Sequence, residues 1–215
     1  MERPNSLTEY YERRAGEYED MYARPHIQAD LGELKGWLAE QVRHRRLLEV
    51  ACGTGYWTAV AASTAQTIQA TDINPGPLAI ARSKGLGSHV TFTQADAYAL
   101  PQYNADFDCG MANLWWSHIP KVRQHAFLTH FLSRLGKGAN LVMIDNNFVP
   151  GTTQISYRDE YGNTYQTRTL RSGEQYEVLK NFPTRSDLRA ALSTFWRHVC
   201  VLELRHFWAV SGQDA

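Results

Sequence analysis

Two glycines, Gly53 and Gly55, follow a short apolar run that ends at Ala51. Glycine adopts backbone angles that other residues avoid, so a chain with this spacing can turn sharply and pass close beneath a ligand. Where such a turn joins a strand to a helix, the first N–H groups of the helix point at the same ligand. We therefore expect a ligand-binding turn at residues 51–55.

Two carboxylates stand where a nucleoside ligand would need them. Asp72 ends the next apolar strand, about 20 residues after the turn, where an acidic side chain can bind both hydroxyls of a ribose. Asp96 ends a third strand, and it could accept a hydrogen bond from an adenine amine while the Ala97 N–H donates to a ring nitrogen. Either aspartate could instead cap a neighbouring turn or helix. Their shared register with the glycine turn favours an adenosine ligand.

The same turn argues against a dinucleotide. The fingerprint for nicotinamide or flavin dinucleotides has Gly or Ala three residues after its second glycine, which lets helix and strand pack closely. This chain has Thr58 there, preceded by the bulky Tyr56 and Trp57. A nicotinamide-dependent oxidoreductase is therefore kept only as an alternative.

A second group of residues follows the fourth and fifth predicted strands. Trp115 and Trp116 could wall a pocket for a flat or cationic substrate, although one of them could pack in the core. His118 could take a proton from a hydroxyl or an amine, with a structural role as an equal alternative. Asp145 is a second candidate base, and Asn146 could orient the substrate by hydrogen bonds.

The elements that must position these residues alternate between strands and helices. Strands are predicted at 46–51, 67–71, 90–94, 107–114 and 140–145, and helices at 56–65, from Pro75, and at 121–135. This alternation indicates an α/β fold with a mainly parallel sheet covered by helices on both faces. Further helices are predicted at about 7–18, 27–42 and 184–193, and closing strands at 199–202 and 206–210. Ligands of such sheets bind beyond the carboxyl ends of the strands, where the candidate residues fall.

Residues 150–180 follow a different pattern. Alternation around Tyr157 and Tyr165, with turn signals at 161–163 and 171–173, predicts a small antiparallel β insertion after the fifth strand. Its place in the chain would let it cover the ligand end of the sheet as a lid. Tyr157 is then a candidate substrate contact, although an alternating tyrosine on a half-buried strand usually serves packing.

Composition restricts the partners. The 215 residues suffice for a single domain, 1–215, and the 22 basic and 22 acidic side chains lack the excess charge of a nucleic-acid binder. No apolar stretch reaches the length of a membrane span. The three cysteines show neither disulfide nor metal-pair spacing, which predicts a reducing, cytoplasmic location. No cluster of His, Cys and carboxylate has ligand spacing, so we expect no metal.

The motifs LLEVACGTGYW, ATDIN, QADAYALP, FDCGMANLWWSHIP and LVMIDNNF occur in the order and spacing typical of class I S-adenosylmethionine-dependent methyltransferases. Over roughly residues 7–148, the chain resembles the small bacterial enzymes of this family often called type 11. The resemblance implies a Rossmann-like three-layer α/β/α sandwich with a mostly parallel, seven-stranded sheet whose last strand is antiparallel. It also implies one domain with a helical cap at 1–45, a cofactor-binding core at 46–148 and the insertion at 150–180.

The resemblance further implies S-adenosyl-L-methionine as the cofactor and S-adenosyl-L-homocysteine as its product. It places the following residues at this cofactor: Glu49, Ala51, Gly53 and Gly55 at the methionine part, Asp72 and Ile73 at the ribose, Asp96 and Ala97 at the adenine, and Asn113 after the fourth strand. Ala51 departs from the family pattern, which has the first glycine of the turn there. The alanine narrows the space beneath the ligand.

The N-terminal segment YYERRAGEYE resembles the helix that closes over the cofactor in these enzymes. Arg14 is a charge complement for the cofactor carboxylate, and Tyr11 and Tyr18 could also reach it. Alternatively, this amphipathic helix only packs its aromatic side chains on the rim of the sheet.

The expected activity is transfer of a methyl group to a small-molecule substrate by direct in-line displacement. The segment after the fourth strand lacks the two prolines found there in amino-methylating nucleic-acid enzymes of this fold, and the net charge is zero, so base methylation is only a minor alternative and no nucleic-acid partner is expected. Because no apolar stretch is long enough to span a membrane, no membrane partner is expected either. The protein should act as a monomer or homodimer. A cofactor-binding protein without catalysis is the remaining alternative.

Overall fold

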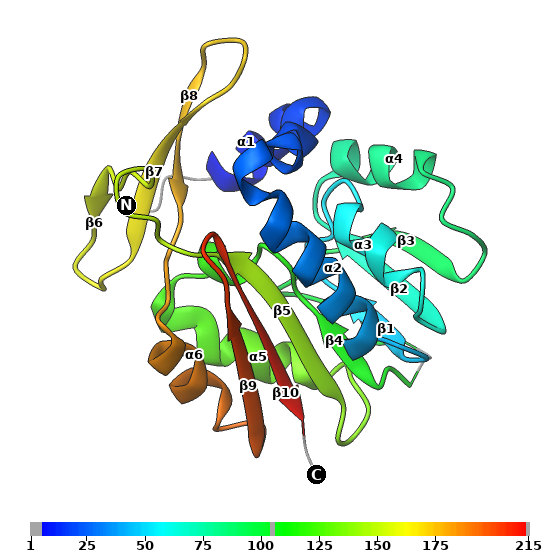
Figure 1. Ribbon diagram of the computed structural model, residues 1–215. Helices are drawn as coiled ribbons and strands as arrows, with labels where there is room; N and C mark the ends of the chain where they lie inside the picture. Colours follow the sequence, from blue (N-terminus) through cyan, green and yellow to red (C-terminus); the bar gives the residue numbers. More distant parts are fainter. Residues whose placement is uncertain (1–5, 104–105, 214–215) are drawn as a thin grey trace.

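Seven strands form one sheet in the spatial order β3-β2-β1-β4-β5-β10-β9 (Figure 1). The computed structural model describes residues 6–103 and 106–213, so residues 1–5 of the expected cap lie outside the described part. The strands are β1 (Arg46–Glu49), β2 (Thr67–Asp72), β3 (Val90–Gln94), β4 (Cys109–Met111), β5 (Asn140–Asn146), β9 (His198–Glu203) and β10 (Phe207–Gln213). The first five pair in parallel, whereas β10 runs antiparallel to both of its neighbours. The predicted mostly parallel sheet with an antiparallel last strand is confirmed.

Consecutive residues of the central strands point to opposite faces of this sheet. Leu47 belongs to one buried cluster and Leu48 to the other. The first cluster includes side chains of α2 (Gln28–Gln41), α3 (Tyr56–Ala61) and α4 (Pro75–Ser83). The second includes side chains of α5 (Gln124–Leu132) and α6 (Arg185–Leu192). Both faces are thus covered, which confirms the three-layer α/β/α sandwich and explains why the strands read as apolar runs.

The strand order reverses at β1, which pairs with β2 on one side and with β4 on the other. In open α/β sheets the carboxyl ends of the strands at such a reversal form the ligand-binding crevice. The glycine turn, Asp72 and Asn113 lie at or just beyond the carboxyl ends of these strands. The topology therefore places the predicted cofactor residues at one edge of the sheet.

Two further parts of the chain lie beyond this edge. The insertion forms a second, antiparallel sheet of β6 (Tyr157–Arg158), β7 (Thr164–Thr169) and β8 (Gln175–Leu179). Figure 1 shows it standing beside α1 (Ser6–Arg14). Buried Tyr10 of α1 packs against Val178 of β8, and Arg13 forms an ion pair with Glu174. The N-terminal helix and the insertion thus form one continuous layer, the roof, over this edge of the sheet.

Several predicted elements differ in their bounds from the observed ones, and three of these differences shape the site. The first helix ends at Arg14 and continues as the 3₁₀ segment η1 (Ala15–Ala23), followed by the short η2 (Pro25–Ile27). The fourth strand ends at Met111 because Leu114 adopts a left-handed φ of 54°, which an extended strand does not allow. The chain turns there into η3 (Trp116–His118), and η4 (Lys121–Arg123) precedes α5. Among the described residues, no helix combines the length and apolar character needed to cross a bilayer.

Candidate active site

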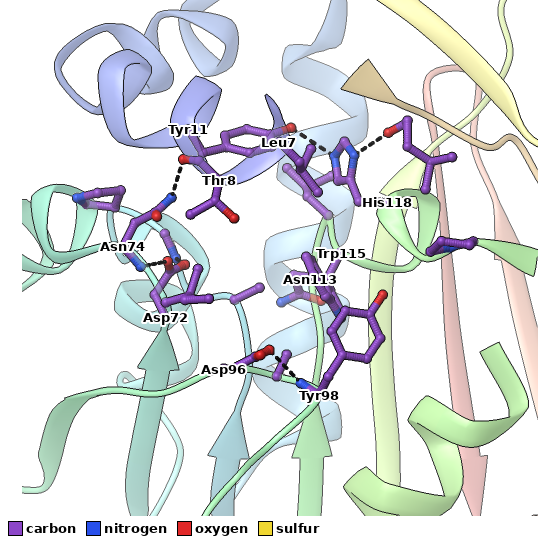
Figure 2. A pocket seen from close by; sticks show the side chains of 18 of the residues that line it. Leu7, Thr8, Tyr11, Asp72, Asn74, Asp96, Tyr98, Asn113, Trp115 and His118 are labelled. Carbon is purple, nitrogen blue, oxygen red and sulfur yellow. Dashed lines mark hydrogen bonds between the residues drawn. The ribbon is translucent and has the colours of Figure 1, made fainter. Parts of the chain in front are cut away.

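A cavity of about 1170 Å³ opens at the carboxyl ends of β1 to β4, beneath the roof formed by α1 and the insertion (Figure 2). Single small-molecule sites commonly measure about 300–1,000 Å³. The space is therefore large enough for a cofactor and a second small molecule together. The predicted site residues in its wall are Tyr11, Tyr18, Ala51, Gly53, Asp72, Ile73, Asp96, Ala97, Asn113, Trp115, His118 and Tyr157.

The glycine turn contains three residues with positive φ: Ala51 (51°), Gly53 (56°) and Gly55 (77°). For alanine this left-handed conformation costs roughly 1–2 kcal/mol, so the departure from glycine at position 51 strains the backbone at the cavity wall. Gly55 does not line the cavity. A Cβ there would lie 3.0 Å from the Cβ of Ala81, so Gly55 permits close packing between the turn and α4.

Asp72 holds this turn in place. Its carboxylate accepts hydrogen bonds from the backbone N–H of Gly53 (2.8 Å) and of Asn74 (2.9 Å). Burial raises its pKa, and the backbone donors oppose that shift. The two readings of Asp72 are therefore compatible, since it binds the backbone before α4 and still borders the cavity. Asp96 likewise accepts from the Tyr98 N–H at 2.8 Å and lines the cavity beside Ala97.

Glu49 lies outside the main cavity. It borders a neighbouring space of about 20 Å³, together with Ala51, Gly53 and Asn113. Thr58 Oγ1 donates to Glu49 Oε2 at 2.7 Å, but burial, and secondarily the charge of Asp72, raise the pKa of Glu49 to about 8. A buried carboxyl group of this kind ionises when a cation comes close. It therefore fits the ammonium end of an amino-acid ligand.

Asn113 provides an independent sign of a polar ligand. Its side chain is only 5% exposed, and neither its amide nitrogen nor its amide oxygen has a hydrogen-bond partner among the described residues. It borders both the main cavity and the smaller one beside Glu49. Buried amides without partners are rare in folded proteins. An adjoining ligand with both donors and acceptors would satisfy it.

His118 and Tyr11 meet across the cavity (Figure 2). His118 Nδ1 lies 2.6 Å from the carbonyl oxygen of Leu179, and Nε2 lies 2.8 Å from the Tyr11 hydroxyl. Because a carbonyl oxygen can only accept, the hydrogen of the neutral ring sits on Nδ1, and Nε2 accepts from Tyr11. Burial, and next the charge of Lys180, lower the pKa of His118 to about 3. The ring therefore presents an uncharged nitrogen with a lone pair to the cavity.

The two remaining residues of the predicted N-terminal set behave differently. Tyr18 lines the cavity, and burial raises its pKa to about 12. Arg14 does not line it. Its guanidinium lies 5.5 and 5.3 Å from the ring centres of Tyr10 and Tyr18, respectively. Arg14 thus contacts two tyrosine rings of the N-terminal segment, and the structure does not place it at a ligand carboxylate.

Three predicted substrate-side residues do not reach the cavity. Trp116 is 1% exposed and packs in the core on the α5 side of the sheet, so only Trp115 faces the ligand space. Asp145 is fully buried in an ion pair with Lys180 Nζ at 2.8 Å, so its oxygens are already bound and it is not available as a base. Asn146, next to it on β5, also lies outside the cavity wall.

The cavity wall also contains residues that the sequence reasoning did not select. Arg123 stacks on the ring of Tyr98 at 3.9 Å. Tyr165, a candidate lid residue of the predicted insertion, stacks on Tyr157 with ring centres 4.4 Å apart. Glu177 of β8 lines the same end. Tyr98 lies in the same QADAYALP motif as Asp96, which was a usable signal. No local signal placed Arg123 or Glu177 there. No His, Cys or carboxylate group suited to a metal occurs within residues 6–103 and 106–213.

The fold and this cavity together define an enzyme of the class I methyltransferase architecture. Residues 47–138 match the family model described as "Methyltransferase domain". The malonyl-[acyl-carrier protein] O-methyltransferase of Serratia marcescens is 25% identical over 198 residues, which cover 91% of this chain and 69% of that protein.

Solved structures share the fold. The DhpI–SAH complex is 25% identical with a TM-score of 0.79 and covers 98% of this chain and 96% of its own. The DhpI–SAM–HEP complex is 24% identical with a TM-score of 0.80, covering 97% and 96%, respectively. CalS10, an amino pentose methyltransferase from Micromonospora echinaspora, has a TM-score of 0.60 at 19% identity and covers 88% and 97%. The chain is a class I S-adenosylmethionine-dependent methyltransferase, and S-adenosylmethionine is its cofactor.

Proposed function

We propose that this enzyme methylates a small molecule held between His118 and the β insertion, by direct in-line displacement. One observation carries the proposal: a single cavity runs from Asp72 and Asp96 to His118, Tyr157 and Tyr165. Cofactor and acceptor would therefore share one continuous cavity. Holding two reactants in line can lower a barrier by roughly 7–11 kcal/mol.

The cofactor end fits S-adenosylmethionine. We assign the ribose to Asp72 with Ile73, the adenine to Asp96 with Ala97, and the amino-acid end to the Ala51–Gly53 turn, Asn113 and Glu49. The orphaned amide of Asn113 and the buried carboxyl group of Glu49 support the last assignment. Tyr11 and Tyr18 would close over the ligand from above. When bound, S-adenosylmethionine supplies a methyl group activated by its sulfonium and leaves as S-adenosylhomocysteine.

His118 is the proposed catalytic residue on the acceptor side. Its Nε2 would accept a hydrogen bond from the nucleophilic atom of the acceptor in place of the Tyr11 hydroxyl. As that atom forms its bond to the methyl carbon it becomes strongly acidic, and its proton passes to Nε2. The ring is uncharged beforehand because burial and Lys180 disfavour its protonation. Such proton transfer typically contributes about 10²–10⁴-fold to a rate.

Several observations support a small acceptor. Aromatic rings of Tyr98, Trp115, Tyr157 and Tyr165 narrow this end of the cavity, and Arg123 and Glu177 add polar groups. The relative from Serratia marcescens is named as an O-methyltransferase, which makes oxygen the first atom to examine. The N-terminal cap, the core and the 150–180 lid would then act as one domain, since all three contribute to the cavity wall.

Calorimetry followed by an acceptor screen tests the proposal. We expect S-adenosylmethionine and S-adenosylhomocysteine to bind, NADH not to bind, and Asp72→Ala to weaken both adenosyl ligands. Asp106→Ala, which removes an exposed carboxylate that pairs with Arg46, is the matched control and should bind normally. Release of S-adenosylhomocysteine in the presence of candidate acceptors then reports turnover. Binding of NADH alone, or normal cofactor binding by Asp72→Ala, would refute the assignment.

A further inference from the structure

The last residue of β8 and the two residues after it form hydrogen bonds with the loop that carries His118. Three consecutive residues, 179–181, bind three others, 117–119. His118 Nδ1–H donates to the Leu179 carbonyl at 2.6 Å, Lys180 Nζ donates to Ser117 Oγ at 2.7 Å, and Asn181 N–H donates to the Ser117 carbonyl at 2.8 Å. The Asn181 side chain also donates to the Ile119 carbonyl at 3.2 Å. The insertion is therefore part of the machinery that orients His118, and more than a cover.

A buried ion pair adjoins these hydrogen bonds. Lys180 is 4% exposed and donates to Asp145 Oδ1 at 2.8 Å. The other oxygen of Asp145 accepts from the Ser117 N–H at 3.0 Å, and Oδ1 also accepts from the Asn146 N–H at 2.7 Å. Neither charged residue lines the cavity, so neither contacts the acceptor. A buried pair rarely adds net stability over apolar packing, so its placement calls for another explanation.

The pair also controls the electrostatic environment of His118. The groups that face the imidazole are Tyr11 from α1, Arg168 from β7, Asp145 from β5 and Lys180, which directly follows β8. After burial, the charge of Lys180 is the largest influence that lowers the pKa of His118, and Arg168 acts in the same direction. Asp145 opposes them. The charge of Lys180 therefore disfavours an imidazolium.

We propose that Lys180 and Asp145 are positioning residues for His118. Asp145 holds the Ser117 backbone, and Lys180 ties β8 to the same loop, so the Leu179 carbonyl fixes the ring with its hydrogen on Nδ1. Nε2 then carries no hydrogen and can accept from the acceptor in place of Tyr11, and burial together with the charge of Lys180 keeps it unprotonated. This inference rests on the proposed role of His118 in methyl transfer.

Three variants test it: Lys180→Met, Asp145→Asn and the double variant, which leaves no unpaired buried charge. Ring-nitrogen NMR reports the tautomer and titration of His118, identified among the eight histidines by comparison with His118→Ala. Lys180→Met should raise the pKa of His118, because it removes a cation and leaves Asp145. Asp145→Asn should move that pKa in the opposite direction, and the double variant should fall between them. All three should lose the pure Nδ1–H tautomer.

Turnover provides the second readout. Misplacing the ring should lower kcat by roughly 100-fold in Lys180→Met and in the double variant, while the Kd for S-adenosylhomocysteine stays within about twofold. Lys137→Met, an exposed lysine before β5, should change neither quantity. Unchanged tautomer and kcat in Lys180→Met would overturn the proposal. Shifts of the pKa in the same direction in both single variants, with equal loss of ligand binding, would also overturn it by indicating general loosening.

The NMR experiment tests this inference independently of the proposed function. If His118→Ala turned over normally, His118 would not be the base. The ring-nitrogen spectra would still show whether Lys180 and Asp145 fix the imidazole, and a mixed tautomer in the double variant would still support the positioning.

Discussion

Glu49 shows how a single buried side chain links ligand binding to pH. Its carboxyl group accepts one hydrogen bond from Thr58 and has a pKa of about 8. A group whose folded-state pKa lies above its unfolded value stabilises the fold fully below the unfolded pKa. That contribution is lost as the pH rises through the folded pKa. The ligand-free enzyme should therefore lose stability between about pH 5 and 8.

Glu49→Gln should remove this loss, because the amide does not ionise. By the usual conversion of 1.36 kcal/mol per pKa unit, the effect is several kcal/mol, up to about 5. Urea unfolding of both proteins at pH 5, 6.5 and 8 measures it: the wild-type free energy of unfolding should fall with pH relative to that of the variant. Parallel pH dependences would show that Glu49 does not titrate in this range.

His118 leads to a second prediction at the residue scale. His118→Ala should lower kcat by about 10²–10⁴-fold and leave cofactor affinity nearly unchanged, since the ring lies at the acceptor end. Because the pKa of His118 is about 3, the wild-type rate should show no acid limb from this residue above about pH 5. Tyr11→Phe is the comparison, since it removes only the hydroxyl that occupies Nε2. An acid limb in wild type near pH 6 that disappears in His118→Ala would contradict the low pKa.

Whether the sequence predicted a site residue depends on how the fold positions that residue. Gly53, Asp72 and Asp96 lie at the carboxyl ends of strands or within four residues of them, so the parallel sheet alone brings them together. Glu177 reaches the cavity, and Lys180 reaches the loop of His118, only because β8 packs against α1 and η3, which no local pattern specifies. Lys180 still left a signal, since a lysine directly after the apolar residues Val178 and Leu179 needs a buried partner. The buried Asp145 is that partner.

For helices and strands, the sequence predicts the type of an element better than its first and last residues. The parallel core and the antiparallel insertion follow from hydrophobic periodicity. The turn after β4 does not, because it depends on the left-handed backbone of Leu114. That turn decides that Trp115 faces the cavity while Trp116 enters the core. Because the two tryptophans are adjacent and have equal propensities, the sequence does not show which of them faces the cavity.

Gly55 gives the prediction that belongs to this scale. Gly55→Ala must adopt a left-handed φ, which costs roughly 1–2 kcal/mol, and its methyl group would press on Ala81 of α4. Overpacking of this kind adds about 1–3 kcal/mol. Gly138→Ala is the matched control, because its φ is also positive (73°) but no atom lies within 4 Å of the new methyl group. Thermal unfolding should show a clearly larger loss for Gly55→Ala. Equal losses would mean that α3 and α4 adjust without strain.

For the whole molecule, the question is how a ligand enters or leaves. Asp72 and Asn113 are almost fully buried, and α1, η1 and the insertion cover the cavity. Exposed ion pairs join these covering parts, with Arg171 of the insertion bound to Glu17 and Asp20 of η1. On the inner side, Thr54 of the glycine turn and Lys84 bind Glu19. Separation of the N-terminal segment from the core, or from the insertion, would therefore widen the path by which the product leaves.

Arg171→Ala should accordingly speed the release of S-adenosylhomocysteine. Exposed ion pairs are weak, so the increase should be only about two- to fivefold and should shrink at high salt, where the wild-type pairs are already screened. Arg185→Ala, which removes a comparable exposed pair with Glu203 away from the roof, is the control. Stopped-flow dissociation at low and high ionic strength measures both variants. If Arg171→Ala released product at the wild-type rate while Lys84→Ala released it faster, opening would occur between η1 and the core, with the contact between η1 and the insertion kept intact.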